Sequence, residues 1–143
     1  MGISSDALHG EKVGVATILA SAEYHRLAGM KEIKWRDYPG LEESFILETF
    51  GEELGKGLIE ENRQDCAQGI TKEMLAAHWE EVCAIIDKIP GPDQLRSLYR
   101  QIGAKAELAD IGLTEEKTGM LLDYSPIARN RLTLMRLRRA MEA

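Results

Sequence analysis

Histidine is the residue type that best suits metal binding or proton transfer near neutral pH, and this chain has three, at His9, His25 and His78. His9 and His25 fall on one predicted helix, where a rise of 1.5 Å per residue separates them by about 24 Å, so they cannot share a metal ion. His78 belongs to a different predicted helix. A single histidine is more often a surface or core residue than a ligand, so spacing alone assigns no metal site.

The residues around His9 set it apart from the other two histidines. They read Leu8-His9-Gly10-Glu11-Lys12-Val13-Gly14-Val15-Ala16-Thr17. This stretch resembles the His-Gly-Glu segment of the iron-containing alcohol dehydrogenase and dehydroquinate synthase-like superfamily, in the form most similar to sn-glycerol-1-phosphate dehydrogenases. Weaker matches extend the resemblance over nearly all of the chain, at Gly51-Glu52-Glu53-Leu54-Gly55, the helix at Pro92, Ile102-Gly103-Ala104, Ile111-Gly112-Leu113-Thr114 and Asn130-Arg131-Leu132-Thr133-Leu134, where Leu132 stands in place of a usual tyrosine.

The resemblance implies that His9 opens a helix of the C-terminal domain and binds the catalytic divalent metal, which is zinc, iron or nickel. In the complete enzyme it implies NAD(P) as cofactor and the interconversion of dihydroxyacetone phosphate and glycerol 1-phosphate. A metal held by two imidazoles and a carboxylate keeps open positions that can bind a substrate hydroxyl and lower its pKa. Glu11 either favours the helix N-terminus or orients His9 through a hydrogen bond, and the helix dipole favours the first role.

The resemblance also implies that essential parts lie outside these 143 residues. In the superfamily an acidic ligand, a second histidine and the glycine-rich nucleotide-binding domain all precede the His-Gly-Glu segment. We therefore expect a helical C-terminal domain that is inactive alone, binds metal and NAD(P) weakly by itself, and has a nucleotide-binding N-terminal domain as partner, with a homo-oligomer as a further option. The alternatives are a domain of a glycerol dehydrogenase, an alcohol dehydrogenase or a 3-dehydroquinate synthase, or a non-catalytic helical interaction module.

Arginines accumulate near the C-terminus, against the acidic balance of the chain. Their usual role is solvation and pairing with acidic helices, and exposed pairs of this kind contribute little to stability. A second hypothesis is that Arg129 or Arg131 holds a substrate phosphate, because a guanidinium fork matches phosphate oxygens. Cys66 and Cys83 have no base beside them in sequence, which indicates inert thiols.

Composition bounds the class of protein. With 143 residues, 44% hydrophobic and 29% charged, residues 1–143 are predicted to form one soluble domain with its own core. A net charge of −6 argues against nucleic acid as a partner. The longest apolar stretch, residues 13–20, is too short to span a membrane. Two cysteines without metal-ligand spacing favour reduced thiols and a cytoplasmic location.

The spacing of apolar residues is helical throughout, so we predict an all-α, bundle-like domain with almost no strand. Asp6 and Thr71 are predicted helix caps, and Pro92 suits a first helical turn. Gly51, Gly55 and Gly57 are unfavourable inside a helix, which indicates either close approach of another helix or a kink. The predicted helices cover residues 8–28, 41–64, 71–88, 92–102, a segment after Thr114, and 125 to the end.

Overall fold

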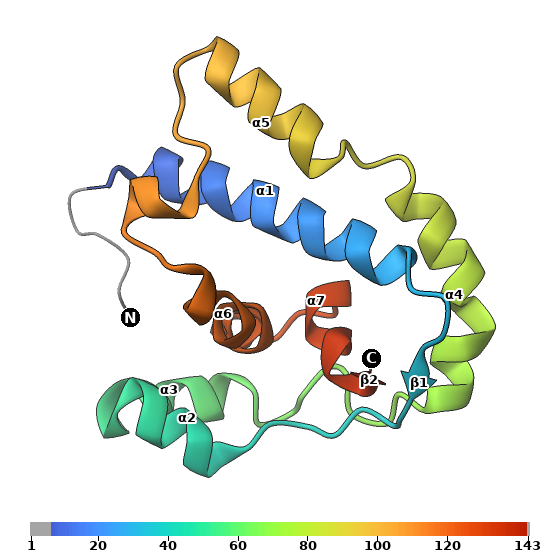
Figure 1. The fold of residues 1–143 in the computed structure, drawn as a ribbon. Helices are drawn as coiled ribbons and strands as arrows, with labels where there is room; N and C mark the ends of the chain where they lie inside the picture. The colour runs from blue at the N-terminus through green and yellow to red at the C-terminus, as the bar shows by residue number, and fades with distance from the viewer. Residues whose placement is uncertain (1–6, 143) are drawn as a thin grey trace. The chain divides into compact units, whose positions relative to one another are not determined.

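The computed structural model describes residues 7–142, and these form a mostly helical structure with one pair of two-residue strands (Figure 1). The all-α expectation is confirmed. The chain divides into two compact units, the first from Met1–Lys31 and Glu80–Met120, the second from Glu32–Trp79 and Leu121–Ala143. The elements are α1 (His9–Ala28), β1 (Lys34–Trp35), α2 (Glu43–Phe50), α3 (Glu52–Glu61), α4 (Lys72–Ile86), α5 (Pro92–Gln101), α6 (Thr118–Tyr124), α7 (Leu134–Leu137) and β2 (Met141–Glu142), with short 3-10 helices η1 (Leu108–Ile111), η2 (Glu115–Lys117), η3 (Ser125–Ala128) and η4 (Arg138–Ala140).

The first unit is built on α1, whose bounds match the predicted helix. Val15, Ile18 and Leu27 recur at helical spacing and are buried, which gives the helix one apolar face. The N–H of Gly29 donates to the carbonyl of His25 and ends the helix. The predicted cap at Asp6 lies outside the described residues.

Two further contacts hold α1 in the first unit. Helix α5 runs alongside it in Figure 1, and the ring of Tyr99 lies 3.0 Å from the position that a Cβ on Gly14 would occupy. Near the other end of α1, the Ser21 hydroxyl donates to the carbonyl of Pro90 at 2.6 Å. Both the short helix at Pro92 and its end before Gly103, where φ is +71°, are confirmed.

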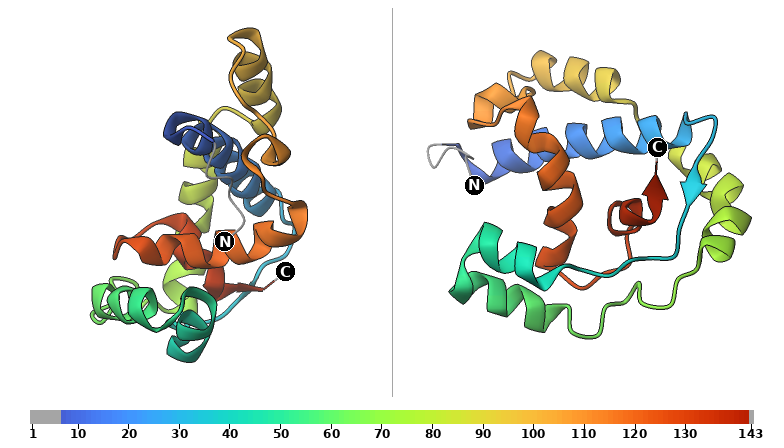
Figure 2. Two further views of the ribbon diagram at one scale, coloured as in Figure 1. Left: turned by 90° about the vertical axis from the view of Figure 1, so that its left-hand side faces the viewer. Right: turned by 60° about the horizontal axis from the view of Figure 1, so that its bottom comes forward.

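In the second unit, the single helix predicted over residues 41–64 is wrong, because the chain reverses at Gly51. This residue has φ +81° and ψ 167°, a conformation outside the helical region, and it separates α2 from α3. A Cβ on Gly55 would lie 3.2 Å from the Cα of Leu47, so α3 packs closely on α2, as the two further views also show (Figure 2). Gly51 therefore makes the break and Gly55 permits the close approach. Leu54 of α3 is 58% exposed.

Helix α4 begins after Thr71, whose hydroxyl accepts the N–H of Met74 at 3.3 Å and confirms the predicted cap. Met74, His78 and Ile85 of this helix are exposed. Within the second unit, the rings of Trp35 and Trp79 meet edge to face at 5.2 Å.

The helix predicted from residue 125 to the end is also wrong. The chain forms η3, leaves the helical conformation at Arg129, and resumes as the four-residue α7, where the Thr133 side chain accepts the N–H of Arg136. Strand β2 then pairs antiparallel with β1, placing Trp35 opposite Met141. Beside this pair, the N–H of Arg36 donates to the carbonyl of Ala140 at 3.0 Å. None of the helices in the described part of the chain is long and apolar enough to cross a membrane.

Candidate functional site

His9 is the first residue of α1, and its side chain is exposed. The chain enters the helix through Leu8, whose N–H donates to Oε2 of Glu11 at 2.9 Å. A carboxylate in this position pairs one of the free N–H groups of the helix start and lies favourably in the helix dipole. Glu11 therefore performs the first of its two predicted roles, and it fixes the backbone turn that carries His9.

One face of α1 is exposed along the first half of the helix, and His9 lies on it. Val13, Ala16 and Thr17 follow His9 at intervals of four, seven and eight residues, which places all four on the same side of a helix, and each is exposed. Val13 is 49% exposed and Leu8, directly before the helix, is 69% exposed. The histidine thus stands beside an apolar surface that the described residues do not cover.

The described residues do not complete a metal site around His9. Within residues 7–142, no three side chains among His, Cys, Asp and Glu come together in a way that could hold a metal ion. His25 lies in the same helix but contacts the carbonyl of Ile89 through Nε2 at 2.9 Å, and His78 is exposed on α4. A catalytic zinc site takes three protein ligands, so His9 could provide one of them and the others would come from elsewhere.

Arg129 and Arg131, the candidates for phosphate binding, have exposed side chains in the second unit, whereas His9 belongs to the first. Nη1 of Arg129 donates to the carbonyl of Ala128 at 3.1 Å. Their backbone has a separate role, because the carbonyls of Arg129 and Arg131 accept hydrogen bonds from Arg136 at 2.9 and 3.1 Å. The segment that carries both candidates is therefore held by a third arginine.

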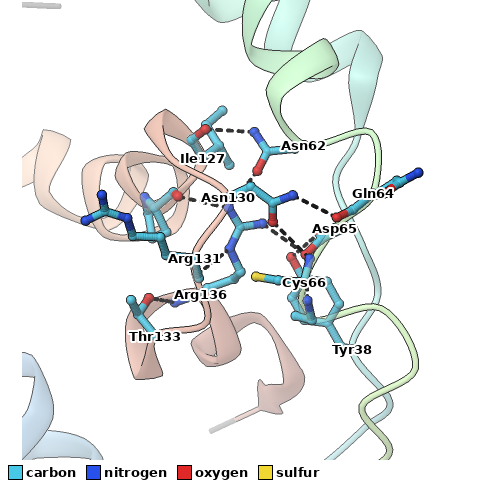
Figure 3. Close-up of polar contacts among 12 residues, drawn as sticks. Tyr38, Asn62, Gln64, Asp65, Cys66, Ile127, Asn130, Arg131, Thr133 and Arg136 are labelled. Atoms are coloured by element: carbon cyan, nitrogen blue, oxygen red, sulfur yellow. Dashed lines mark hydrogen bonds and ion pairs between the residues drawn. The ribbon is translucent and has the colours of Figure 1, made fainter.

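Arg136 belongs to the group of C-terminal arginines for which solvation is the usual role, but its side chain is buried and only 1% exposed. Figure 3 shows the polar groups that surround it. Its Nη1 donates to Oδ1 of Asp65 at 3.1 Å, and its Nη2 donates to Oδ1 of Asn62 at 2.6 Å. Asn62 in turn donates to the carbonyl of Ile127 at 2.7 Å. The apolar neighbours Met135 and Leu137 were the available signal, because an arginine inside such a stretch faces a core more readily than one in a charged run.

The cluster extends from Asp65 to Tyr38 and to the segment around Cys66. The Tyr38 hydroxyl donates to Oδ2 of Asp65 at 2.8 Å, and burial, with the adjacent carboxylate adding to it, raises the pKa of Tyr38 to about 12. Asn130 accepts the N–H of Cys66 at 2.9 Å and donates to the carbonyl of Gln64 at 2.7 Å. These contacts connect the end of α3 with residues 127–136, as Figure 3 shows.

The chemistry available in the described residues is thus of two kinds. His9 offers one exposed imidazole at a fixed helix start, and the Arg136 cluster offers buried groups that are engaged with one another. The Arg136 cluster is typical of a structural polar core, because buried charged groups need partners. Comparison of the chain with protein-family models, curated proteins and solved structures found no match.

Proposed function

We propose that this chain is the C-terminal helical domain of a metal-dependent NAD(P) polyol-phosphate dehydrogenase resembling sn-glycerol-1-phosphate dehydrogenase, and that it is inactive alone. The observation that carries the proposal is the exposed His9 at the start of α1, within the His-Gly-Glu segment and beside an uncovered apolar surface. Such a surface is expected where a second domain docks.

In this proposal His9 contributes one ligand to a divalent metal, and a nucleotide-binding domain contributes the remaining ligands and the NAD(P) site. When bound, the metal supplies Lewis acidity toward a substrate hydroxyl or carbonyl. The part of this chain is to present the imidazole in a fixed position. Glu11 serves that purpose, because its bond to the N–H of Leu8 orders the first turn.

The apolar surface has a proposed occupant of its own. Leu8 and Val13 would contact the nucleotide-binding domain, as the loss of exposed apolar area favours association. In the absence of that domain, two copies of the chain would cover the same residues by forming a homo-oligomer. Sedimentation of the purified chain, with and without the added domain, measures both events.

The proposed substrate class depends on phosphate recognition. Arg129 and Arg131 have exposed guanidinium groups that can meet phosphate oxygens in two-point contacts. Glycerol dehydrogenases and alcohol dehydrogenases act on substrates without that phosphate. Reactivity with dihydroxyacetone phosphate but not with dihydroxyacetone would therefore favour the phosphate-dependent member, and loss of that preference in Arg131→Gln would assign the contact.

The test is a calorimetric titration of the chain with Zn²⁺, Ni²⁺ and Fe²⁺, followed by an assay of NADH oxidation with dihydroxyacetone phosphate. Both are repeated after addition of the nucleotide-binding domain of an sn-glycerol-1-phosphate dehydrogenase. We expect tight metal binding and turnover in the mixture, and loss of both in His9→Ala. The matched control is His78→Ala, which removes another exposed helical imidazole and should leave both unchanged. The proposal would be overturned if no mixture showed tight metal binding or NADH oxidation, or if the His9→Ala variant behaved like the parent.

A further inference from the structure

The second unit contains a cavity of about 650 Å³ at the side of the α2–α3 pair. Its walls come from residues 38–41, from the first turns of α2 and from the end of α3 with the turn that follows. Pockets of roughly 300–1,000 Å³ are typical of small-molecule sites. We propose that this cavity binds a small organic cation, namely a primary ammonium group on a short alkyl chain.

Three of the polar residues that line the cavity, Tyr38, Asn62 and Asp65, can act only as hydrogen-bond acceptors toward a ligand. The single hydroxyl proton of Tyr38 is donated to Asp65, so the phenol oxygen can only accept from a ligand. Both amide protons of Asn62 are used, on the carbonyls of Leu58 and Ile127. Asp65 is a carboxylate with remaining lone pairs on Oδ2. A ligand that reaches these groups must therefore donate protons, as an ammonium group does in three directions.

The charge around the cavity has the matching sign. The two helices beside it carry six glutamates and one lysine, and one of these glutamates, Glu43, lines the cavity itself. Arg63 also lines it, but its guanidinium forms an ion pair with Glu60. The buried Arg136 is balanced by Asp65. Glu43 therefore adds a negative charge at the lining that these two ion pairs do not offset, and this charge favours cations over anions.

Apolar side chains supply the remaining lining and set the shape of the ligand. The apolar part of the lining consists of Ile46 in α2, together with Ile59, Leu41 and Pro39. Burial of a short alkyl chain against them favours binding because its methylenes are removed from water. The combination of acceptors and apolar wall favours an alkylammonium ion over a bare metal cation or a polyol.

The test titrates the chain with hexylammonium chloride, followed by amide chemical shifts, with hexanoate and hexanol as matched anionic and neutral probes. We expect saturable shifts at residues 38–46 and 59–68, with a Kd on the order of 1 mM, as a small ligand allows. Glu43→Gln should weaken binding about tenfold by removing a carboxylate at the cavity. Glu53→Gln, which changes the net charge equally but lies outside the lining, should change it less than about twofold.

Three outcomes would overturn the inference. Equal effects of Glu43→Gln and Glu53→Gln would mean unspecific attraction to the acidic helices. Tighter binding of hexanoate, lost in Arg63→Gln, would mean an anion site. Shifts that do not saturate for any probe would mean that the cavity holds water alone. A second variant, Tyr38→Phe, removes an acceptor oxygen without changing charge and should also weaken hexylammonium binding. The site uses no residue of α1, so this test is separate from the metal test.

Discussion

Removal of the Arg136 side chain should destabilise the second unit more than any other single truncation of an arginine in it. The guanidinium is buried, and it donates to Asp65, Asn62 and the carbonyls of Pro126, Arg129 and Arg131. Arg136→Ala leaves these acceptors without a donor and leaves Asp65, whose side chain is 12% exposed, without its counter-charge. Breaking a buried pair by removal of one partner costs about 3–5 kcal/mol.

That cost is large relative to the stability of a domain of this size, which is about 5–15 kcal/mol. A loss of 3–5 kcal/mol should lower the unfolding midpoint by ~10 °C or more. This loss of stability comes mainly from the acceptors and the carboxylate that are left buried without a partner. The attraction within the ion pair contributes less, because the desolvation of both ions partly offsets it. Arg136→Lys should cost nearly as much, because one ammonium group cannot reach acceptors on opposite sides of a planar guanidinium.

The assay is urea and thermal unfolding, followed by far-UV circular dichroism and by tryptophan fluorescence. The two tryptophans of the chain, Trp35 and Trp79, both belong to the second unit, so fluorescence reports on that unit. The control is Arg131→Ala, which truncates an exposed arginine, keeps the carbonyl that accepts from Arg136, and should change stability by less than about 0.5 kcal/mol. A loss below about 1 kcal/mol in Arg136→Ala by both probes would refute the reasoning.

Three other predictions concern α3, one tyrosine and the two thiols. Gly55→Ala should destabilise the chain by about 1–3 kcal/mol because its Cβ would press on the α2 backbone, whereas Gly57→Ala, with open space around the added methyl, should stabilise it by about 0.4–1 kcal/mol in urea unfolding. In an alkaline absorbance titration, Tyr38 should ionise near pH 12. Since its folded pKa lies above the unfolded value of 10.0, the stability that it contributes is complete below pH 10 and is lost as pH rises toward 12; an ionisation near pH 10 that is absent in Tyr38→Phe would contradict this. At pH 8 Cys66, which is exposed, should react with iodoacetamide faster than Cys83, whose pKa is raised by burial and by nearby carboxylates; equal rates by mass spectrometry would show that Cys83 is not protected.

Local signals were sufficient for the parts of the fold that depend on neighbours in sequence. The bounds of α1 and α5, the cap at Thr71 and the stop at Gly103 were all predictable, because periodicity, caps and glycine conformations act within one or two turns. The same holds for the role of Glu11 at the helix start, three residues from the N–H that it accepts. His9 as a metal ligand stays a prediction, since its proposed co-ligands lie outside the chain.

Tertiary structure decided the rest. The periodicity over residues 41–64 continues through Gly51, and the glycines there fit a close approach or a kink equally well. The backbone conformation of Gly51 and the packing of α3 on α2 decide that the chain reverses there. The apolar neighbours of Arg136 are compatible with burial, but it is buried because Asn62 and Asp65, more than 70 residues away, supply the acceptors that its charge requires. The cavity beside α2 has the same origin, as its walls come from segments that meet only in the folded unit. Sequence determined where helices can form, and long-range partners determined which charged groups the fold could bury.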